Sequence, residues 1–295
     1  MDDGCSGERT RRYLSRGFAC SRCEQASCGA NILTSLMELK FVICGIEHSG
    51  TTLVSDVFRQ VAAVDSGFEC GVLLGDSPKV FSSVQPFYRN MLDGWQISAD
   101  TLEGICDTDS FSAFYQRLYR KAGFFDPSVE YLFDKTPRYF QHLFECQEKI
   151  GLPFIATYKD PRSMVFSDFK RGANGRTFEE WYEQYKPGKL RYLSSIYDHS
   201  YSKWRAGTHA KTSEILCVAL EDICLNTRES LEKMFAHVGF GFDVRYLLMK
   251  NLRYSHNRAP QVSSRIPFEY LESLSKSQIA SIEQDFSNLQ DWFYE

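Results

Sequence analysis

Four short apolar runs give the chain its pattern, and residues that favour helices follow them. The runs are KFVIC, EYLFD, LPFIATY and SEILCVAL, which have the form of buried parallel strands. After the first run, apolar residues recur at helical spacing from Leu53 to Ala62. Thr136 and Asp160, each followed by proline, predict the N-caps of two further helices. This alternation predicts an α/β fold with a central parallel sheet flanked by helices.

The remaining pattern predicts how the rest of the chain is organised. A loop-rich, aromatic region extends from Asp65 to about Asp126, and a helical stretch from Phe178 to Trp204 is broken at Pro187. Asn226 and Glu229 have the spacing of a capping box, and a last amphipathic helix covers about Gln278–Trp292. We expect residues 1–36 to be a leader that is disordered or not part of the fold, and residues 37–295 to form a single α/β domain.

Composition narrows the class of protein. The 295 residues are 43% hydrophobic and 24% charged, which is typical of a globular chain with a sizeable core. The net charge of −4 argues against a broadly basic nucleic-acid surface, so no nucleic-acid partner is expected. No apolar stretch approaches the roughly 18 residues of a membrane span. The N-terminus starts acidic and lacks an apolar core, so we expect a cytoplasmic protein without a secretion signal.

The ten cysteines fall into two groups. Six are scattered in mostly apolar surroundings and are predicted to be reduced core residues: Cys44, Cys70, Cys106, Cys146, Cys217 and Cys224. The other four, Cys5, Cys20, Cys23 and Cys28, contain one C-x2-C pair. They could form a zinc site, although a disordered leader explains them equally simply. No metal is expected to take part in the chemistry.

The segment FVICGIEHSGTTLV has the form of a phosphate-binding loop between a strand and a helix. Backbone N–H groups at the helix start bind anions, and Ser49, Thr51 and Thr52 add hydroxyl donors. Thr51 follows the second glycine, Gly50, where ATP- and GTP-hydrolysing proteins have the lysine that reaches the β- and γ-phosphates. The loop is therefore expected to hold a phosphate of a nucleotide whose γ-phosphate is not transferred.

These residues resemble the first nucleotide motif of sulfotransferases that use 3′-phosphoadenosine 5′-phosphosulfate (PAPS), G-x-x-[RK]-S-G-T-T-L. Residues 45–53 match it except at His48, where the family has a cation beside the bridging oxygen. The resemblance implies a P-loop-like fold, PAPS as co-substrate and 3′-phosphoadenosine 5′-phosphate (PAP) as product. The motif spacing is closest to the protein-tyrosine branch of the family.

A second motif is similar to the one that binds the ribose 3′-phosphate in this family. Lys159 ends a predicted strand, Ser167 follows eight residues later, and Arg171 lies where the protein-tyrosine branch has another phosphate-binding arginine. Ser167 and Arg171 are four residues apart, so one helix face presents both. Alternatively, these charges are simply the solvated face of a basic helix.

The resemblance also implies catalytic roles. Sulfuryl transfer to an alcohol needs a base for the acceptor hydroxyl and a donor at the leaving oxygen. Glu69, in an apolar stretch expected to raise its pKa, matches the offset of the catalytic glutamate in the protein-tyrosine branch. Lys135, in DKTPR, matches a lysine that stabilises the sulfuryl group. His48 would serve as a donor only if it is protonated; otherwise Lys135 acts alone. Alternatively, Glu69 is a loop residue paired with a nearby arginine or lysine, and Lys135 pairs with Asp134 or Glu130.

Two other functions compete with sulfuryl transfer. One is a phosphotransferase of the nucleotide-kinase type, and the other is a binding protein whose chemistry was lost with the change to His48. The acceptor is expected to be a hydroxyl-bearing small molecule, lipid or saccharide. Aromatic residues between Phe81 and Tyr119 could stack on it, or could be helix core. Glu221 and Asp222, an acidic pair after the last strand, are interpreted as scaffold.

Overall fold

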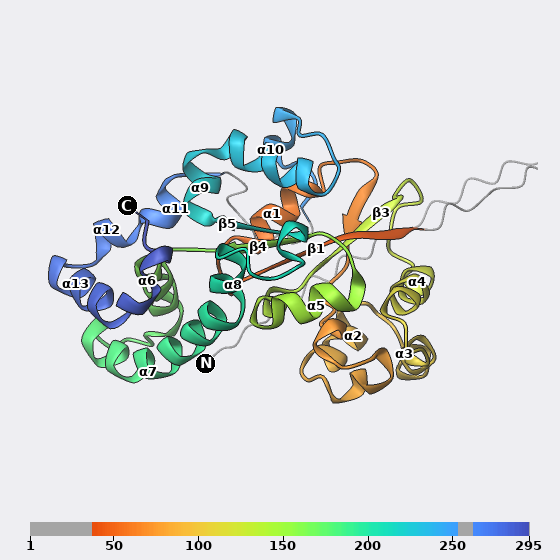
Figure 1. The fold of residues 1–295 in the computed structure, drawn as a ribbon, viewed down its shortest axis with the longest axis horizontal. Coiled ribbons are helices and arrows are strands. Elements are labelled where there is room, and N and C mark those ends of the chain that lie inside the picture. Colours follow the sequence, from red (N-terminus) through yellow and green to blue (C-terminus); the bar gives the residue numbers. More distant parts are fainter. Residues whose placement is uncertain (1–36, 253–261, 295) are drawn as a thin grey trace, which may run out of the picture. The chain divides into compact units, whose positions relative to one another are not determined.

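The computed structural model describes residues 37–252 and 262–294 (Figure 1). The predicted leader and the four cysteines of the possible zinc site lie outside the described residues. The boundary at residue 36 therefore stays a prediction.

A five-stranded parallel sheet forms the centre of the domain, in the order β2-β3-β1-β4-β5. Its strands are β1 (Glu38–Gly45), β2 (Val64–Ser66), β3 (Tyr131–Lys135), β4 (Phe154–Tyr158) and β5 (Ile215–Ala219). Four of them coincide with the apolar runs, so the prediction of a parallel α/β fold is confirmed. The additional strand, β2, has only three residues, too few to show periodicity.

Helices cover both faces of the sheet (Figure 1). Successive side chains of β1 point to opposite faces, and each face belongs to its own hydrophobic core. Phe41 and Ile43 pack with α1 (Thr51–Phe58), α9 (Leu220–Leu225) and α10 (Thr227–His237). Val42 and Cys44 face the larger core. The helices that contribute to this core are α4 (Phe111–Lys121), α5 (Leu143–Ile150), α6 (Pro161–Gly172), α7 (Phe178–Ile196) and α13 (Lys276–Asp285).

The aromatic region after β2 is mostly core. It contains α2 (Phe87–Gly94) and α3 (Ala99–Cys106), and the side chains of Phe81, Phe114 and Tyr115 are buried. The six scattered cysteines are buried and unpaired, as predicted. The remaining short helices are α8 (Ser202–Arg205), α11 (Arg265–Phe268) and α12 (Tyr270–Ser273).

Three local predictions were wrong. Thr136 does not cap the helical segment after it, because its hydroxyl makes tertiary hydrogen bonds instead. Asn226 makes no side-chain capping bond to α10. Helix α7 continues through Pro187, because one missing N–H removes only one bond of a 19-residue helix. By contrast, Asp160 caps α6 as expected, accepting a bond from the Arg162 N–H at 2.7 Å.

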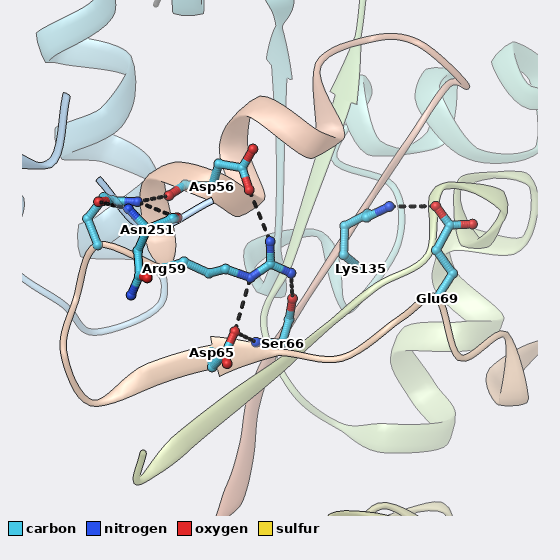
Figure 2. Close-up of polar contacts among 8 residues, drawn as sticks. Asp56, Arg59, Asp65, Ser66, Glu69, Lys135 and Asn251 are labelled. Atoms are coloured by element: carbon cyan, nitrogen blue, oxygen red, sulfur yellow. Dashed lines mark hydrogen bonds and ion pairs between the residues drawn. The ribbon is translucent and has the colours of Figure 1, made fainter. Parts of the chain in front are cut away.

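A buried arginine connects α1 to β2 (Figure 2). The Arg59 guanidinium donates to Asp56 and to Asp65, both at 3.0 Å, and to the Ser66 hydroxyl. The side chains of Arg59 and Asp56 are each only 4% exposed. The helix that begins at the phosphate-binding loop is thereby fixed to the strand that leads to Glu69.

We predict that Arg59→Met lowers the free energy of unfolding by about 3–5 kcal/mol, because it removes the guanidinium that pairs with the buried Asp56 carboxylate and the part-buried Asp65 carboxylate. Chemical denaturation measures the change. The control is Arg228→Met, which removes an exposed ion pair with Glu232 on α10 and should leave the midpoint nearly unchanged. Equal effects of the two substitutions would contradict a structural role for the Arg59 cluster.

Candidate active site

The loop between β1 and α1 is fixed to β4 by a serine. The Ser49 hydroxyl lies 2.6 Å from the Ile46 carbonyl oxygen, 2.9 Å from the Thr157 carbonyl oxygen and 2.7 Å from the Thr157 hydroxyl. Gly45 lies so close to this strand that a Cβ atom would be 2.4 Å from the Thr157 carbonyl oxygen. The Ser49 hydroxyl is thus directed into the protein, whereas the sequence had suggested a donor to a phosphate.

The start of α1 presents backbone donors. Gly50 is its N-cap, with a left-handed φ of 91° and no room for a Cβ, which would lie 2.7 Å from Leu220 Cδ1. The first backbone bond of the helix joins the Val54 N–H to the Gly50 carbonyl oxygen. The N–H groups that precede Val54 in this turn therefore have no acceptor within the helix. They can bind an anion at the loop.

A cavity of about 570 Å³ opens at this loop and brings most of the predicted site residues together. The loop side is formed by Glu47, His48, Gly50, Thr51 and Thr52. Glu69, Lys135 and Arg171, which come from three other segments, line the same cavity. Its volume lies within the range of small-molecule sites.

Glu69 and Lys135 form an ion pair in this cavity (Figure 2). Lys135 Nζ lies 2.5 Å from Glu69 Oε1, with the lysine side chain 6% and the glutamate side chain 29% exposed. Lys135 is the last residue of β3, and Glu69 lies in the segment after β2, the neighbouring strand. The partial exposure leaves the carboxylate accessible from the cavity.

A buried hydrogen-bond network next to the ion pair connects the segment that carries Glu69 to the segment that carries Lys135. The Thr136 hydroxyl donates to Asp134 at 2.8 Å and accepts from the Cys70 and Gly71 N–H groups at 3.1 and 3.2 Å. Asp134 also accepts from the phenols of Tyr115 and Tyr139, at 2.5 and 2.8 Å. Burial raises the pKa of Asp134, while the hydroxyl donors oppose that shift. The residues that flank Glu69 and Lys135 are therefore bonded to one another.

Trp95 supports the segment on the other side of Glu69. Its Nε1 donates to the Phe68 carbonyl oxygen at 3.1 Å. Its ring lies so close to Gly67 that a Cβ there would be 2.1 Å from ring carbons. The backbone is thus held both before and after Glu69.

Lys159 is a buried cation, only 2% exposed, at the junction of β4 and α6. Its Nζ lies 2.7 Å from the Ser167 hydroxyl and 3.3 Å from the Ser163 carbonyl oxygen. Within the described residues, no carboxylate lies at ion-pair distance from it. Burial lowers the pKa of Lys159 to about 8, which Asp168 and Glu221 partly oppose. A buried ammonium without a carboxylate partner is costly, and an anionic ligand would reduce that cost.

Glu221 lies close to Lys159 and is 1% exposed. Its Oε1 accepts from the Asp160 N–H at 3.1 Å, whereas Oε2 has no partner within the described residues. Burial raises the pKa of Glu221 to about 7. Arg162 holds Asp160 in place with a forked bond, and the Tyr294 N–H donates to the same carboxylate at 3.0 Å.

The two predicted phosphate-binding clusters lie near each other. Arg171 lines the cavity, pairs with Asp168 at 3.0 Å, and comes from the same helix as Ser167.

The surroundings of His48 lower the pKa of its imidazole. Partial burial has the largest effect, and the positive charges of Arg171 and Lys159 act in the same direction. The backbone at His48 has a left-handed φ of 68°. The lowered pKa favours the neutral imidazole.

Several cavity residues were not predicted from the sequence. They are Glu47 in the loop, Pro86 and Asn90 at the start of α2, and Pro137 and Arg138 after β3. Phe87, one of the aromatic residues considered for stacking on the acceptor, also lines the cavity. Arg138 is three residues after Lys135 in DKTPR, so the motif itself contained the signal.

Neither a metal-binding cluster nor a membrane-spanning helix occurs among the described residues. No group of three or more His, Cys, Asp or Glu side chains in this part of the chain could hold a metal ion. Within residues 37–252 and 262–294, no helix has the length and apolar character needed to cross a bilayer.

The class of protein follows from the similarity of this chain to known proteins. A family model described as "Sulfotransferase family" matches residues 41–243, more than half of the chain. The sulfotransferase domain of the Synechococcus PCC 7002 olefin synthase is similar in structure, with 16% identity and a TM-score of 0.53 over 84% of this chain and 94% of that one. A sulfotransferase domain from the curacin biosynthetic pathway gives 13% identity and a TM-score of 0.52 over 86% and 99%. No curated protein sequence matches.

The fold and the family model together define a sulfotransferase-type α/β domain. The chain belongs to the sulfotransferase family. The expectations of this family, of a sulfuryl-transferring enzyme and of PAPS as its donor are confirmed at the level of the family. No comparison distinguishes the protein-tyrosine branch from the others.

The pH dependence of stability provides a test of the buried Glu221. A raised pKa in the folded state means that stability is lost as the pH rises from about 4.5 to about 7. Relative to wild type, Glu221→Gln should therefore become more stable by up to about 3 kcal/mol across that interval. Denaturation curves at pH 4.5, 6 and 8 measure the difference. A stability difference that stays constant from pH 4.5 to 8 would show that the pKa of Glu221 is not raised in the folded protein.

Proposed function

We propose that this protein transfers the sulfuryl group of PAPS to a hydroxyl acceptor bound in the cavity beside Glu69 and Lys135. The observation that carries the proposal is that this cavity unites the β1–α1 loop, the Glu69–Lys135 pair and Arg171. One nucleotide could then contact the loop and α6 while its sulfuryl group faces Glu69.

The donor would be held at two ends. The N–H groups at the start of α1, with the Thr51 and Thr52 hydroxyls, would bind the 5′-phosphosulfate. Ser167 and Arg171 would bind the 3′-phosphate, with Lys159 behind Ser167 supplying buried positive charge. Ser49 would position the loop without touching the ligand, because its hydroxyl is bonded to Ile46 and Thr157.

Glu69 would act as the base in an in-line displacement. It takes the proton of the acceptor hydroxyl as the acceptor oxygen forms its bond to sulfur. The bond between sulfur and the phosphate oxygen breaks, and PAP leaves with the electron pair. Lys135, 2.5 Å from Glu69 before substrates bind, would stabilise the charge on the transferring group.

His48 would have a smaller role than the cation it replaces in the family motif. Its lowered pKa favours neutral imidazole, which can donate one N–H to the leaving oxygen but carries no charge. Lys135 is therefore proposed as the principal cation of the reaction. With Lys135 in this role, the site has a cation to stabilise the transferring group although residue 48 is uncharged.

The proposed acceptor is a hydroxyl compound that fits a polar cavity, and the proposed location of the protein is the cytoplasm. The polar and charged lining of the cavity suits a small molecule or saccharide with hydroxyl groups. Six buried cysteines without disulfides among the described residues support a reducing compartment such as the cytoplasm.

Nucleotide preference tests the proposal against a nucleotide-kinase-type function. We expect PAP to bind at least about tenfold more tightly than ATP in titration calorimetry, because only PAP offers a 3′-phosphate. Lys159→Met should remove most of this preference. The control Lys170→Met changes an exposed lysine of α6 that pairs with Glu269, and it should preserve the preference for PAP. Tighter binding of ATP than of PAP would favour the kinase alternative.

Removal of the proposed base separates an enzyme from an inactive binding relative. Glu69→Gln should lower kcat by about 10²–10⁴-fold while PAP affinity stays unchanged. Turnover of labelled PAPS with a panel of hydroxyl acceptors gives kcat, and calorimetry gives the affinity. An unchanged kcat would rule out Glu69 as the base, and absence of transfer by the wild type would favour the binding relative.

A further inference from the structure

The cavity contains one cation that the proposed reaction does not use. Lys135 pairs with Glu69, and Arg171 pairs with Asp168. Arg138 also lines the cavity and is exposed. Within the part of the chain that the structure describes, no carboxylate lies at ion-pair distance from its guanidinium.

Arg138 is nevertheless held against the cavity wall. Its guanidinium carbon lies 5.7 Å from the centre of the Phe87 ring, a cation–π contact. Phe87 is buried at the start of α2 and so offers a fixed surface. Asn90, one turn further along that helix, lines the same cavity and its side-chain amide makes no hydrogen bond among the described residues. An oriented guanidinium and an amide therefore face the same space.

The residues that line the cavity fall into two groups. The loop residues and Arg171 are assigned to the donor, whereas Phe87, Asn90 and Arg138 come from other segments. Lys135 and Arg138 are separated in the chain only by Thr136 and Pro137. One acceptor can therefore contact Arg138 while its hydroxyl lies at Glu69.

We propose that Arg138, supported by Phe87 and Asn90, binds an anionic group of the acceptor, which is therefore a hydroxyl compound carrying a carboxylate or a phosphate. This inference rests on the proposed function of the cavity. A planar guanidinium matches such groups with two parallel hydrogen bonds. Recognition by Arg138 would fix the orientation in which the hydroxyl reaches Glu69.

Glu47 limits where the anion can lie. It is exposed and lines the cavity. Burial raises the pKa of Tyr192 to about 12; Glu47 adds to that shift and Arg138 opposes it, so both charges lie near the same phenol. Glu47 would repel a carboxylate or phosphate, so within this region an anion is favoured directly beside the Arg138 guanidinium.

Paired acceptors that differ in charge test the inference. The panel contains 4-hydroxyphenylacetate with its amide, glucuronate with glucose, and glycerol 3-phosphate with glycerol. In wild type, kcat/KM should favour the anionic member of at least one pair by about 10- to 100-fold. The carboxylate and phosphate arms identify which anion is preferred.

Substitution of the arginine makes the test specific. Arg138→Gln should reduce that preference to near unity, by lowering kcat/KM for the anionic acceptor about 10- to 100-fold more than for the neutral one. Arg138→Lys should restore part of it, because the charge remains without the forked geometry. The control Arg89→Gln alters an exposed arginine of α2 that does not line the cavity, and should leave the preference unchanged.

The outcomes separate the two proposals. Transfer to neutral acceptors only, or an equal loss for both members of a pair in Arg138→Gln, overturns the anionic acceptor and leaves sulfuryl transfer intact. Failure of the wild type to turn over any anionic acceptor, even though it binds PAP, also overturns it. A wild type that neither binds PAP nor transfers to any acceptor overturns the proposed function and this inference with it.

Discussion

The hydroxyl of Thr136 connects the two halves of the proposed catalytic pair. It joins the end of β3 to the backbone after Glu69 through one bond to Asp134 and two from N–H groups. Glu69 and Lys135 directly precede Cys70 and Thr136 in the sequence. The bonds between these segments therefore help to hold Lys135 Nζ 2.5 Å from Glu69 Oε1. Such preorganisation matters, because a proton is transferred efficiently only between groups held at hydrogen-bond distance.

Electrostatics at the junction of β4 and α6 follow from burial. Lys159 and Glu221 are both almost fully covered, and their pKa values move toward neutrality from opposite sides, to about 8 and about 7. Neither is in direct ionic contact with the other. An anion arriving near Ser167 would favour the charged form of Lys159, so ligand binding and protonation are linked here.

Sequence patterns predicted the elements that depend on local order. The loop at Gly45–Leu53, the Lys159–Ser167 spacing and the cap at Asp160 are contiguous or one helix apart, and short-range rules apply to them. Thr136 was mispredicted as a cap because its side chain can satisfy either a helix end or a tertiary partner, and only packing decides. The contributions of Arg138 and Asn90 to one cavity depend on how the start of α2 contacts the segment after β3, which no spacing encodes. Glu221 was predicted as scaffold, but its depth of burial, which sets its pKa, was not predictable.

The strand order has a consequence for how the protein is made. Because β1 lies between β3 and β4, which both follow it in the chain, the β1–α1 loop emerges from the ribosome long before the strands that complete its surroundings. Ser49 can reach Thr157 only after β4 has paired with β1. Nucleotide present in the cell can therefore stabilise the finished domain but cannot guide its early, largely non-local assembly.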